Sequence, residues 1–255
     1  MIKSASQWNG TAFASNYLEF ATSSTFIRYC FSQGYSYNPW KNSTVYDVGG
    51  GSSNGTANNL GTSFYYPNKN FGAVHLDNAS NYNPGAGKTI YTGAASSNSF
   101  SVAVCWVQNT FNQQYGVDII MGAYASSTHD WWLGFAPNYP QTERYKIAVN
   151  GTVTASTIIP TVGRRYIAIF SNSYSLGDGW AYIYDDQGNE WFGGGLGGKQ
   201  LSTAGNIGIG KYGDYVDNYM PNIYVTDFLF GPYVATGNFI TFLRTFKSKL
   251  GFPGV

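Results

Sequence analysis

The feature that most constrains the fold is a pair of alternating segments in the second half of the chain. In residues 166–170 and 180–184, aromatic and aliphatic side chains recur at every second position, as in β-strands. A polar loop over residues 171–179 joins these segments. Residues 185–189 then have the Asp and Gly composition of a hairpin turn, and residues 190–192 run back from it. The pattern predicts neighbouring antiparallel strands.

Further strand-like segments stand before and after these hairpins, at residues 71–77, 99–107 and 223–230. In this order along the chain, they resemble the strands of the concanavalin A-like, laminin-G-like jelly roll. The resemblance covers about residues 71–255. It implies an all-β, antiparallel β-sandwich (jelly roll) with a short C-terminal helix.

The remaining elements follow from periodicity and turn chemistry. Asn150 and Gly151 form the strongest two-residue hairpin signal. The glycine-rich residues 193–198 are predicted to be a loop. Apolar residues at helical spacing predict a helix that begins near residue 239 and ends at Gly251. Further strands are predicted at residues 26–31, 117–124, 131–135, 145–149, 152–159 and 206–210.

Residues 1–70 differ from the rest of the chain. Residues 48–61 are a Gly, Ser and Asn run that alone indicates a flexible linker or a long loop. We therefore divide the chain into an extended N-terminal arm, residues 1–70, and the sandwich, residues 71–255. Two roles for the arm stay open: neighbours in an assembly hold it, or it packs on its own sandwich.

Composition limits the classes of partner. Charged residues are only 11% of the chain and the formal net charge is +1, without a basic cluster. This argues against nucleic acid or an anionic membrane as the main partner. No apolar run approaches 18 residues, and the first 20 residues lack the apolar core of a secretion signal. Cys30 and Cys105 define no disulfide framework.

Catalytic motifs are weak. Residues 85–89 look like part of a phosphate-binding loop, but the first glycine of that motif is missing and we interpret them as a turn. His75 and His129 have no metal-ligand spacing, and His75 is predicted to be structural. Glycoside hydrolases of the same fold place paired acids on one strand, whereas Asp185, Asp186 and Glu190 straddle a turn. We therefore predict that the chain is not an enzyme.

No cofactor or metal is predicted. Calcium binds to related lectin-like domains, and it stays open as a ligand here without a supporting motif. The oxygen donors on predicted loops are Asp77, Asp178, Asp214 and Asp217.

Sugar binding is the better functional hypothesis. Aromatic rings stack on the apolar faces of sugars, and polar side chains bind the hydroxyl groups. The densest clusters of such residues supply the candidate glycan contacts Trp131, Trp132, Tyr212, Asp214, Tyr215 and Tyr219. Adjacent strand residues face opposite ways, so at least one of the two tryptophans is expected in the core. For the tyrosine-rich cluster, structural tyrosines or a protein contact stay open as alternatives.

The low charge and the abundance of Tyr, Asn and Gly are similar to those of phage virion accessory proteins. This resemblance implies a non-enzymatic structural or adhesion module on the virion surface, of the capsid decoration, head fibre or tail-fibre type. Its implied partners are other virion proteins or further copies of itself, bound through the arm, and glycans on the exposed face. The alternative is a secreted carbohydrate-binding lectin or a glycoside hydrolase of the same fold.

Overall fold

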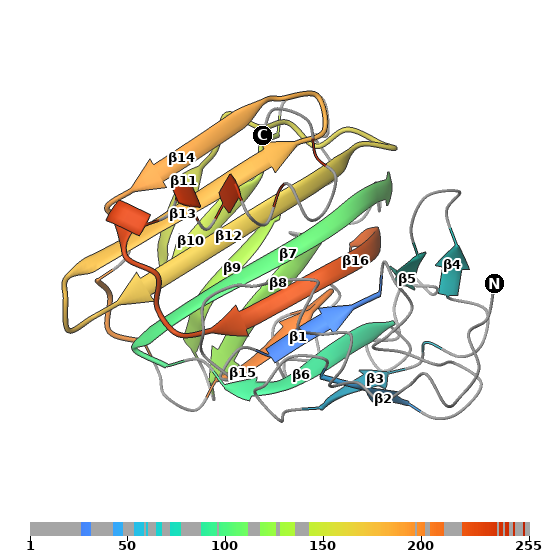
Figure 1. Cartoon of the computed structure of the whole chain (residues 1–255), viewed down its shortest axis with the longest axis horizontal. Coiled ribbons are helices and arrows are strands. Elements are labelled where there is room, and N and C mark those ends of the chain that lie inside the picture. Colours follow the sequence, from blue (N-terminus) through green and yellow to red (C-terminus); the bar gives the residue numbers. More distant parts are fainter. Residues whose placement is uncertain are drawn as a thin grey trace.

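A computed structural model of the chain shows two antiparallel sheets packed face to face (Figure 1). It describes residues 27–31, 43–47, 54–58, 60, 65–67, 72–77, 88–95, 97–111, 118–125, 128–135, 143–196, 198–201, 205–211, 221–238, 240–241, 243–244, 247 and 252. No helix among these residues has the length and apolar character needed to cross a membrane.

Sheet A has the strand order β14-β13-β12-β7-β16-β5-β4, and β1 also pairs with β16. Its strands are β1 (Ile27–Cys30), β4 (Tyr65–Pro67), β5 (Gly72–Leu76), β7 (Ser99–Thr110), β12 (Arg165–Ser173), β13 (Asp178–Asp185), β14 (Glu190–Gly194) and β16 (Asn222–Gly231).

Sheet B has the order β11-β10-β9-β8-β15-β6-β3-β2. Its strands are β2 (Thr44–Val45), β3 (Gly55–Asn58), β6 (Thr89–Ala95), β8 (Asp118–Ala125), β9 (Thr128–Phe135), β10 (Lys146–Val149), β11 (Thr152–Ala155) and β15 (Asn206–Ile209). The predicted all-β, antiparallel sandwich is confirmed.

Side-chain alternation builds the main core between the sheets. In β7, Phe100, Val102, Val104 and Trp106 are buried in that core, as the sequence pattern predicts. The intervening residues of β7, including Cys105, face the other side of sheet A. Cys105 is a free thiol, and burial raises its pKa to about 11, so it is not a reactive nucleophile near neutral pH.

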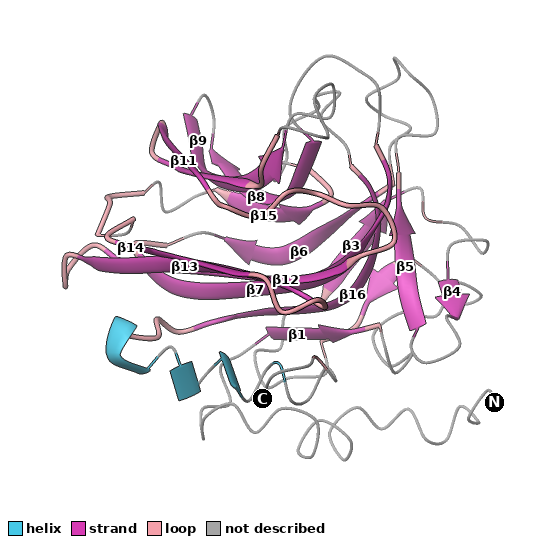
Figure 2. Ribbon diagram, turned by 90° about the horizontal axis from the view of Figure 1, so that it is seen from above, coloured by secondary structure: helices cyan, strands magenta, loops and turns pink. Residues whose placement is uncertain are grey.

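The C-terminal segment covers the outer face of sheet A, on the side away from sheet B (Figure 2). Leu243 and Phe252 are buried there. The Arg165 guanidinium lies 4.4 Å from the centre of the Phe252 ring. Residues 240, 241, 243, 244 and 247 are helical. The Phe252 N–H donates to the Lys247 carbonyl at 3.0 Å, a spacing typical of a Schellman helix end, in agreement with the predicted C-terminal helix.

Asp178 fastens the start of this C-terminal segment to β13. Its carboxylate accepts hydrogen bonds from the Tyr233 hydroxyl and from the backbone N–H and hydroxyl of Thr236, the last at 2.6 Å. Desolvation raises the pKa of Asp178, but the hydrogen bonds from Thr236 and Tyr233 outweigh it, and the net pKa lies below its usual value of 3.8.

Stability should therefore depend on the ionisation of Asp178. Because its pKa is lower in the folded chain, its contribution is complete above pH 3.8 and is lost as the pH falls through the folded pKa. We expect Asp178→Asn to lower the melting temperature at pH 6, and this deficit should shrink towards pH 2.5. Thermal unfolding of both proteins across this range is the measurement. A deficit that stays constant with pH would contradict the assignment.

Strands from residues 1–70 belong to both sheets. β1 pairs with β16 and β4 with β5, while β3 pairs with β6 and carries β2 at the edge of sheet B. The described part of the predicted arm thus packs on its own sandwich. Residues 1–26 lie outside the described part, and the boundary at residue 70 stays a prediction.

The predicted linker over residues 48–61 is wrong at residues 55–58, which form β3. Close packing explains why glycine stands at position 55 of β3. A Cβ atom there would lie 2.4 Å from the Tyr91 carbonyl oxygen and 2.8 Å from the Tyr29 hydroxyl. The predicted loop at residues 193–198 is also partly wrong, since Gly193 and Gly194 end β14.

Candidate functional site

Trp131 belongs to the core. It is 1% exposed, and its ring centre lies 5.6 Å from that of Phe100 and 5.5 Å from that of Phe170. Strand alternation turns it inwards, so it has no open face for a sugar. This burial removes Trp131 from the candidate glycan contacts and agrees with the expectation that one of the two tryptophans is core.

Trp132 points to the outer face of sheet B. A row of paired residues runs from Trp132 across the sheet. Trp132 of β9 pairs with Gly122 of β8, Gly122 pairs with Gly208 of β15, and Gly208 pairs with Tyr91 of β6. The two aromatic residues are thus three strand spacings apart, about 14 Å, across two glycines. Trp132 is only 8% exposed and both glycines are buried, so this row is not open to a ligand in the structure.

The other candidate glycan contacts, Tyr212, Asp214, Tyr215 and Tyr219, lie outside the described residues. The segment that carries them follows Lys211 and precedes Pro221. Lys211 is 5% exposed, and its ammonium lies 3.9 Å from the centre of the Tyr91 ring.

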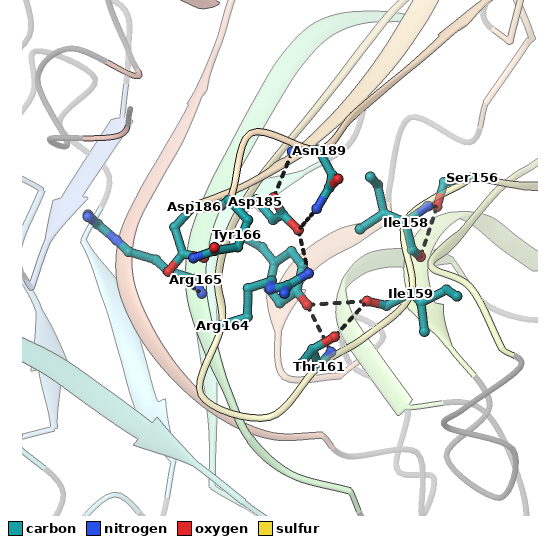
Figure 3. A network of polar contacts seen from close by, with 11 residues as sticks. Ser156, Ile158, Ile159, Thr161, Arg164, Arg165, Tyr166, Asp185, Asp186 and Asn189 are labelled. Atoms are coloured by element: carbon teal, nitrogen blue, oxygen red, sulfur yellow. Dashed lines mark hydrogen bonds and ion pairs between the residues drawn. The ribbon is translucent and has the colours of Figure 1, made fainter. Parts of the chain in front are cut away.

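The acidic cluster at the central hairpin builds the turn. The Asp185 side chain is 1% exposed and forms an ion pair with Arg164 at 2.9 Å. It also accepts hydrogen bonds from the backbone and side chain of Asn189 at 2.9 and 2.8 Å (Figure 3). The Gln187 N–H donates to the same carboxylate at 3.0 Å. Gly188 completes the turn with a φ of 90°. The hairpin turn predicted over residues 185–189 is confirmed.

Neighbouring polar groups of this network also have structural partners. Tyr166 accepts a hydrogen bond from the Thr161 N–H at 2.8 Å and donates one to the Ile159 carbonyl (Figure 3). These bonds join β12 to the segment that connects it with β11 of sheet B. Burial raises the pKa of Tyr166 to about 12. Glu190 accepts a hydrogen bond from the Tyr182 hydroxyl at 2.7 Å.

A second polar cluster lies where β5 and β7 end and β16 begins. His75 of β5 stands opposite Tyr224 of β16, with ring centres 4.6 Å apart and planes 30° apart. Asn222 and Asn109 lie beside this stack, and all four side chains are half-buried. We call these four residues, His75, Asn109, Asn222 and Tyr224, the amide patch.

Hydrogen bonds fix the geometry of the amide patch. The Asn222 Oδ1 atom lies 2.8 Å from His75 Nε2 and accepts a hydrogen bond from Asn109 Nδ2 at 2.9 Å. Within the described part of the chain, Asn222 Nδ2 and Asn109 Oδ1 have no hydrogen-bond partner, and neither atom is buried. The patch therefore offers one amide donor and one amide acceptor to solvent beside a ring stack.

An ion pair borders the amide patch. The Lys88 ammonium lies 2.8 Å from Asp77 Oδ1, and the other oxygen of Asp77 is 3.7 Å from His75 Nε2. The Lys88 N–H also donates to the Asp77 carbonyl at 2.9 Å, so backbone and side chain both join these two residues.

Two of the aspartates considered as calcium donors are thus already engaged. Asp77 pairs with Lys88, and Asp178 accepts three hydrogen bonds. The other two, Asp214 and Asp217, lie outside the described residues. Among the described residues, no group of three or more His, Cys, Asp or Glu side chains is placed to hold a metal ion.

Sequence reasoning missed three members of the amide patch and gave His75 only a structural role. Asn109, Asn222 and Tyr224 carry no motif, and the hydrogen bond between His75 and Asn222 joins residues 147 positions apart. The only local signal was the alternation that places Asn222 and Tyr224 on the same face of one strand.

Comparison with known proteins shows the fold but no family. No family model matches the chain, and no curated protein matches it. Trypanosoma rangeli sialidase in complex with sialic acid is similar over 90% of this chain, with a TM-score of 0.56 and 13% identity. The match covers 33% of the sialidase, so the chain spans about a third of that protein.

Two further solved structures are similar. Domain 4 of the GH43 extracellular arabinanase AbnA from Geobacillus stearothermophilus, in complex with arabinotriose, has a TM-score of 0.50 and 16% identity, over 85% of this chain and 96% of that domain. Botulinum neurotoxin type C, which depends on interaction with two ganglioside molecules to enter cells, has a TM-score of 0.55 and 14% identity. The match covers 88% of this chain and 51% of the neurotoxin chain.

Proposed function

We propose that this chain is a non-enzymatic carbohydrate-binding adhesion module and that the amide patch is its contact surface. The observation that carries the proposal is the solvent-facing amide donor and acceptor of Asn222 and Asn109 beside the ring stack of His75 and Tyr224. Sugar sites combine these two elements, because rings cover the apolar sugar face and amides bind hydroxyl groups. Three neighbouring strands carry these groups, and the register of β16 against β7 shifts between Asn222 and Ile223.

The similar structures support a sugar as the ligand class. The sialidase is bound to sialic acid, the arabinanase domain to arabinotriose, and the neurotoxin depends on gangliosides. These are properties of those proteins, and identities of 13 to 16% carry only the fold to this chain. The proposal therefore rests on the chemistry of the amide patch.

The non-enzymatic part of the proposal is supported by the contacts of the acids. Asp185 and Asp186 accept backbone hydrogen bonds at a turn, and Glu190 accepts a hydrogen bond from the Tyr182 hydroxyl. Glycoside hydrolysis needs two carboxyl groups that face one sugar from either side. The three acids that the sequence singles out instead serve the sandwich itself.

The setting that we propose is a virion surface, as a capsid decoration, head fibre or tail-fibre module. The support is compositional: 11% charged residues with abundant Tyr, Asn and Gly. In this setting the N-terminal region contacts other virion proteins or further copies of the chain, while the amide patch meets glycans. A secreted lectin or a glycoside hydrolase of the same fold is the alternative.

A glycan array with the full chain, followed by calorimetric titration of the strongest ligand, tests the proposal. We expect saturable binding to defined oligosaccharides and no release of reducing ends during prolonged incubation with them. Absence of binding to every glycan would contradict the carbohydrate-binding function. Steady release of reducing ends would favour the hydrolase.

A further inference from the structure

We infer that the amide patch takes an uncharged sugar, which it holds through two hydroxyl groups of one ring, and that Asp77 disfavours acidic sugars. This inference rests on the proposed function and adds the class of ligand. It follows from which amide atoms are already committed inside the protein and from the charges beside them.

The hydrogen bonds assign a separate task to each open amide atom. Asn222 Oδ1 faces both His75 Nε2 and Asn109 Nδ2, so its Nδ2 group remains to donate. Asn109 has committed its Nδ2 group, so its Oδ1 atom remains to accept. Turning over either amide alone would set like groups against each other, so the orientations of the two amides are coupled.

A sugar hydroxyl group suits both positions because it donates and accepts. No hydrogen bond joins Asn109 Oδ1 and Asn222 Nδ2, so each can take a partner of its own. They therefore suit two different hydroxyl groups of one ring. The Tyr224 ring, which stacks on His75, adds aromatic carbon beside these two amides, and C–H groups of a sugar pack well against such carbon.

The charges beside the amide patch favour a neutral ligand. Asp77 is paired with Lys88 at 2.8 Å, so the two side chains add no net charge, but a carboxylate oxygen of Asp77 lies 3.7 Å from His75 Nε2. An acidic sugar would bring a second carboxylate towards Asp77, and the two negative charges would repel each other. The Lys88 ammonium already pairs with Asp77, so it compensates this repulsion only in part.

Matched pairs of oligosaccharides test the inference. We would titrate the full chain with lactose and 3′-sialyllactose, and with arabinotriose as a second neutral probe. We expect the neutral members to bind more tightly than the sialylated one. Asp77→Asn removes the carboxylate but keeps an acceptor for Lys88, and it should narrow the preference for lactose over 3′-sialyllactose at least about threefold.

Asn109→Ala tests the contact itself. It removes the open acceptor and the hydrogen bond from Asn109 Nδ2 to Asn222 Oδ1, but it leaves the contact between His75 and Asn222. We expect affinity for the neutral sugar to fall about tenfold, with only a small drop in melting temperature because the lost hydrogen bond is half-buried. Asn238→Ala is the matched control, because Asn238 is exposed and lies outside the amide patch. It should bind like the unaltered chain.

The failures are distinguishable. Binding confined to 3′-sialyllactose would overturn the neutral-sugar inference and leave the proposed carbohydrate-binding function standing. An unchanged preference in Asp77→Asn would overturn the role of Asp77. Unchanged affinity in Asn109→Ala would show that the sugar does not bind at the amide patch. Failure of every probe to bind would count against the proposed function itself.

Discussion

Replacement of Asp185 by alanine is expected to lower the free energy of unfolding by about 3 kcal/mol, because a buried carboxylate that holds an ion pair and three further hydrogen bonds is lost. The carboxylate is almost fully buried, so its loss leaves the Arg164 guanidinium without its partner at 2.9 Å. It also leaves the N–H groups of Gln187 and Asn189 without their acceptor. The turn between β13 and β14 should loosen as a result.

The control for this substitution is the next residue. Asp186 is half-buried and accepts longer hydrogen bonds, 3.2 Å from the Arg165 N–H and 3.4 Å from the Gln187 side chain. Asp186→Ala should therefore cost only about 1 kcal/mol or less. Urea unfolding of both variants measures the difference. Equal losses in the two variants would contradict the central place of Asp185 in the turn.

Removal of residues 1–70 is expected to abolish cooperative folding. The removed strands and loops carry five large side chains of the main core, which are Ile27, Tyr29, Phe31, Val45 and Leu60. At about 1.5 to 3 kcal/mol for each buried side chain, their loss amounts to roughly 10 kcal/mol. That is comparable to the whole stability of an ordinary domain.

Circular dichroism and thermal unfolding of the shortened chain measure this effect. We expect no cooperative transition and exposure of apolar surface to a hydrophobic dye. The comparison is the full chain carrying Tyr29→Phe, which loses only a hydroxyl that donates to the Thr92 carbonyl and should still unfold cooperatively. A shortened chain that folds as a stable monomer would show that β1 to β4 are dispensable and that the division at residue 70 is real.

Much of the sandwich could be predicted from the sequence, because its central strands alternate strongly. β7, β12 and β13 each place apolar residues on both faces, one towards sheet B and one towards the C-terminal segment. The turn at Asn150 and Gly151 could be predicted because it depends on these two residues alone. Both have positive φ angles, 46° and 78°, as a two-residue hairpin requires.

The N-terminal strands could not be predicted, because partners distant in sequence determine them. β3 consists of Gly, Thr, Ala and Asn, a composition that signals a loop, yet it pairs with β6 about 33 residues away. Its glycine is required by the approach of Tyr29 and Tyr91. Similarly, the two-residue strand β2 is defined only by its pairing with β3.

The candidate site was less predictable than the fold. Alternation required one of Trp131 and Trp132 to be core, but the burial of Trp132 on the outer face depends on tertiary packing. The amide patch joins single polar residues at the ends of three strands, and no periodicity or motif marks such residues. Only the register of β5, β7 and β16 brings them together.

The most direct test of the central claim is nuclear magnetic resonance of the full chain, labelled with ¹⁵N, during titration with the oligosaccharide that it binds best. Asparagine side-chain NH2 signals are assigned by Asn109→Ala, Asn222→Ala and Asn238→Ala. We predict that the Asn222 NH2 signals shift with sugar concentration along the same saturation curve as calorimetry, while the Asn238 signals stay fixed. Saturable binding with the Asn109 and Asn222 signals unmoved would contradict the amide patch as the carbohydrate-binding surface.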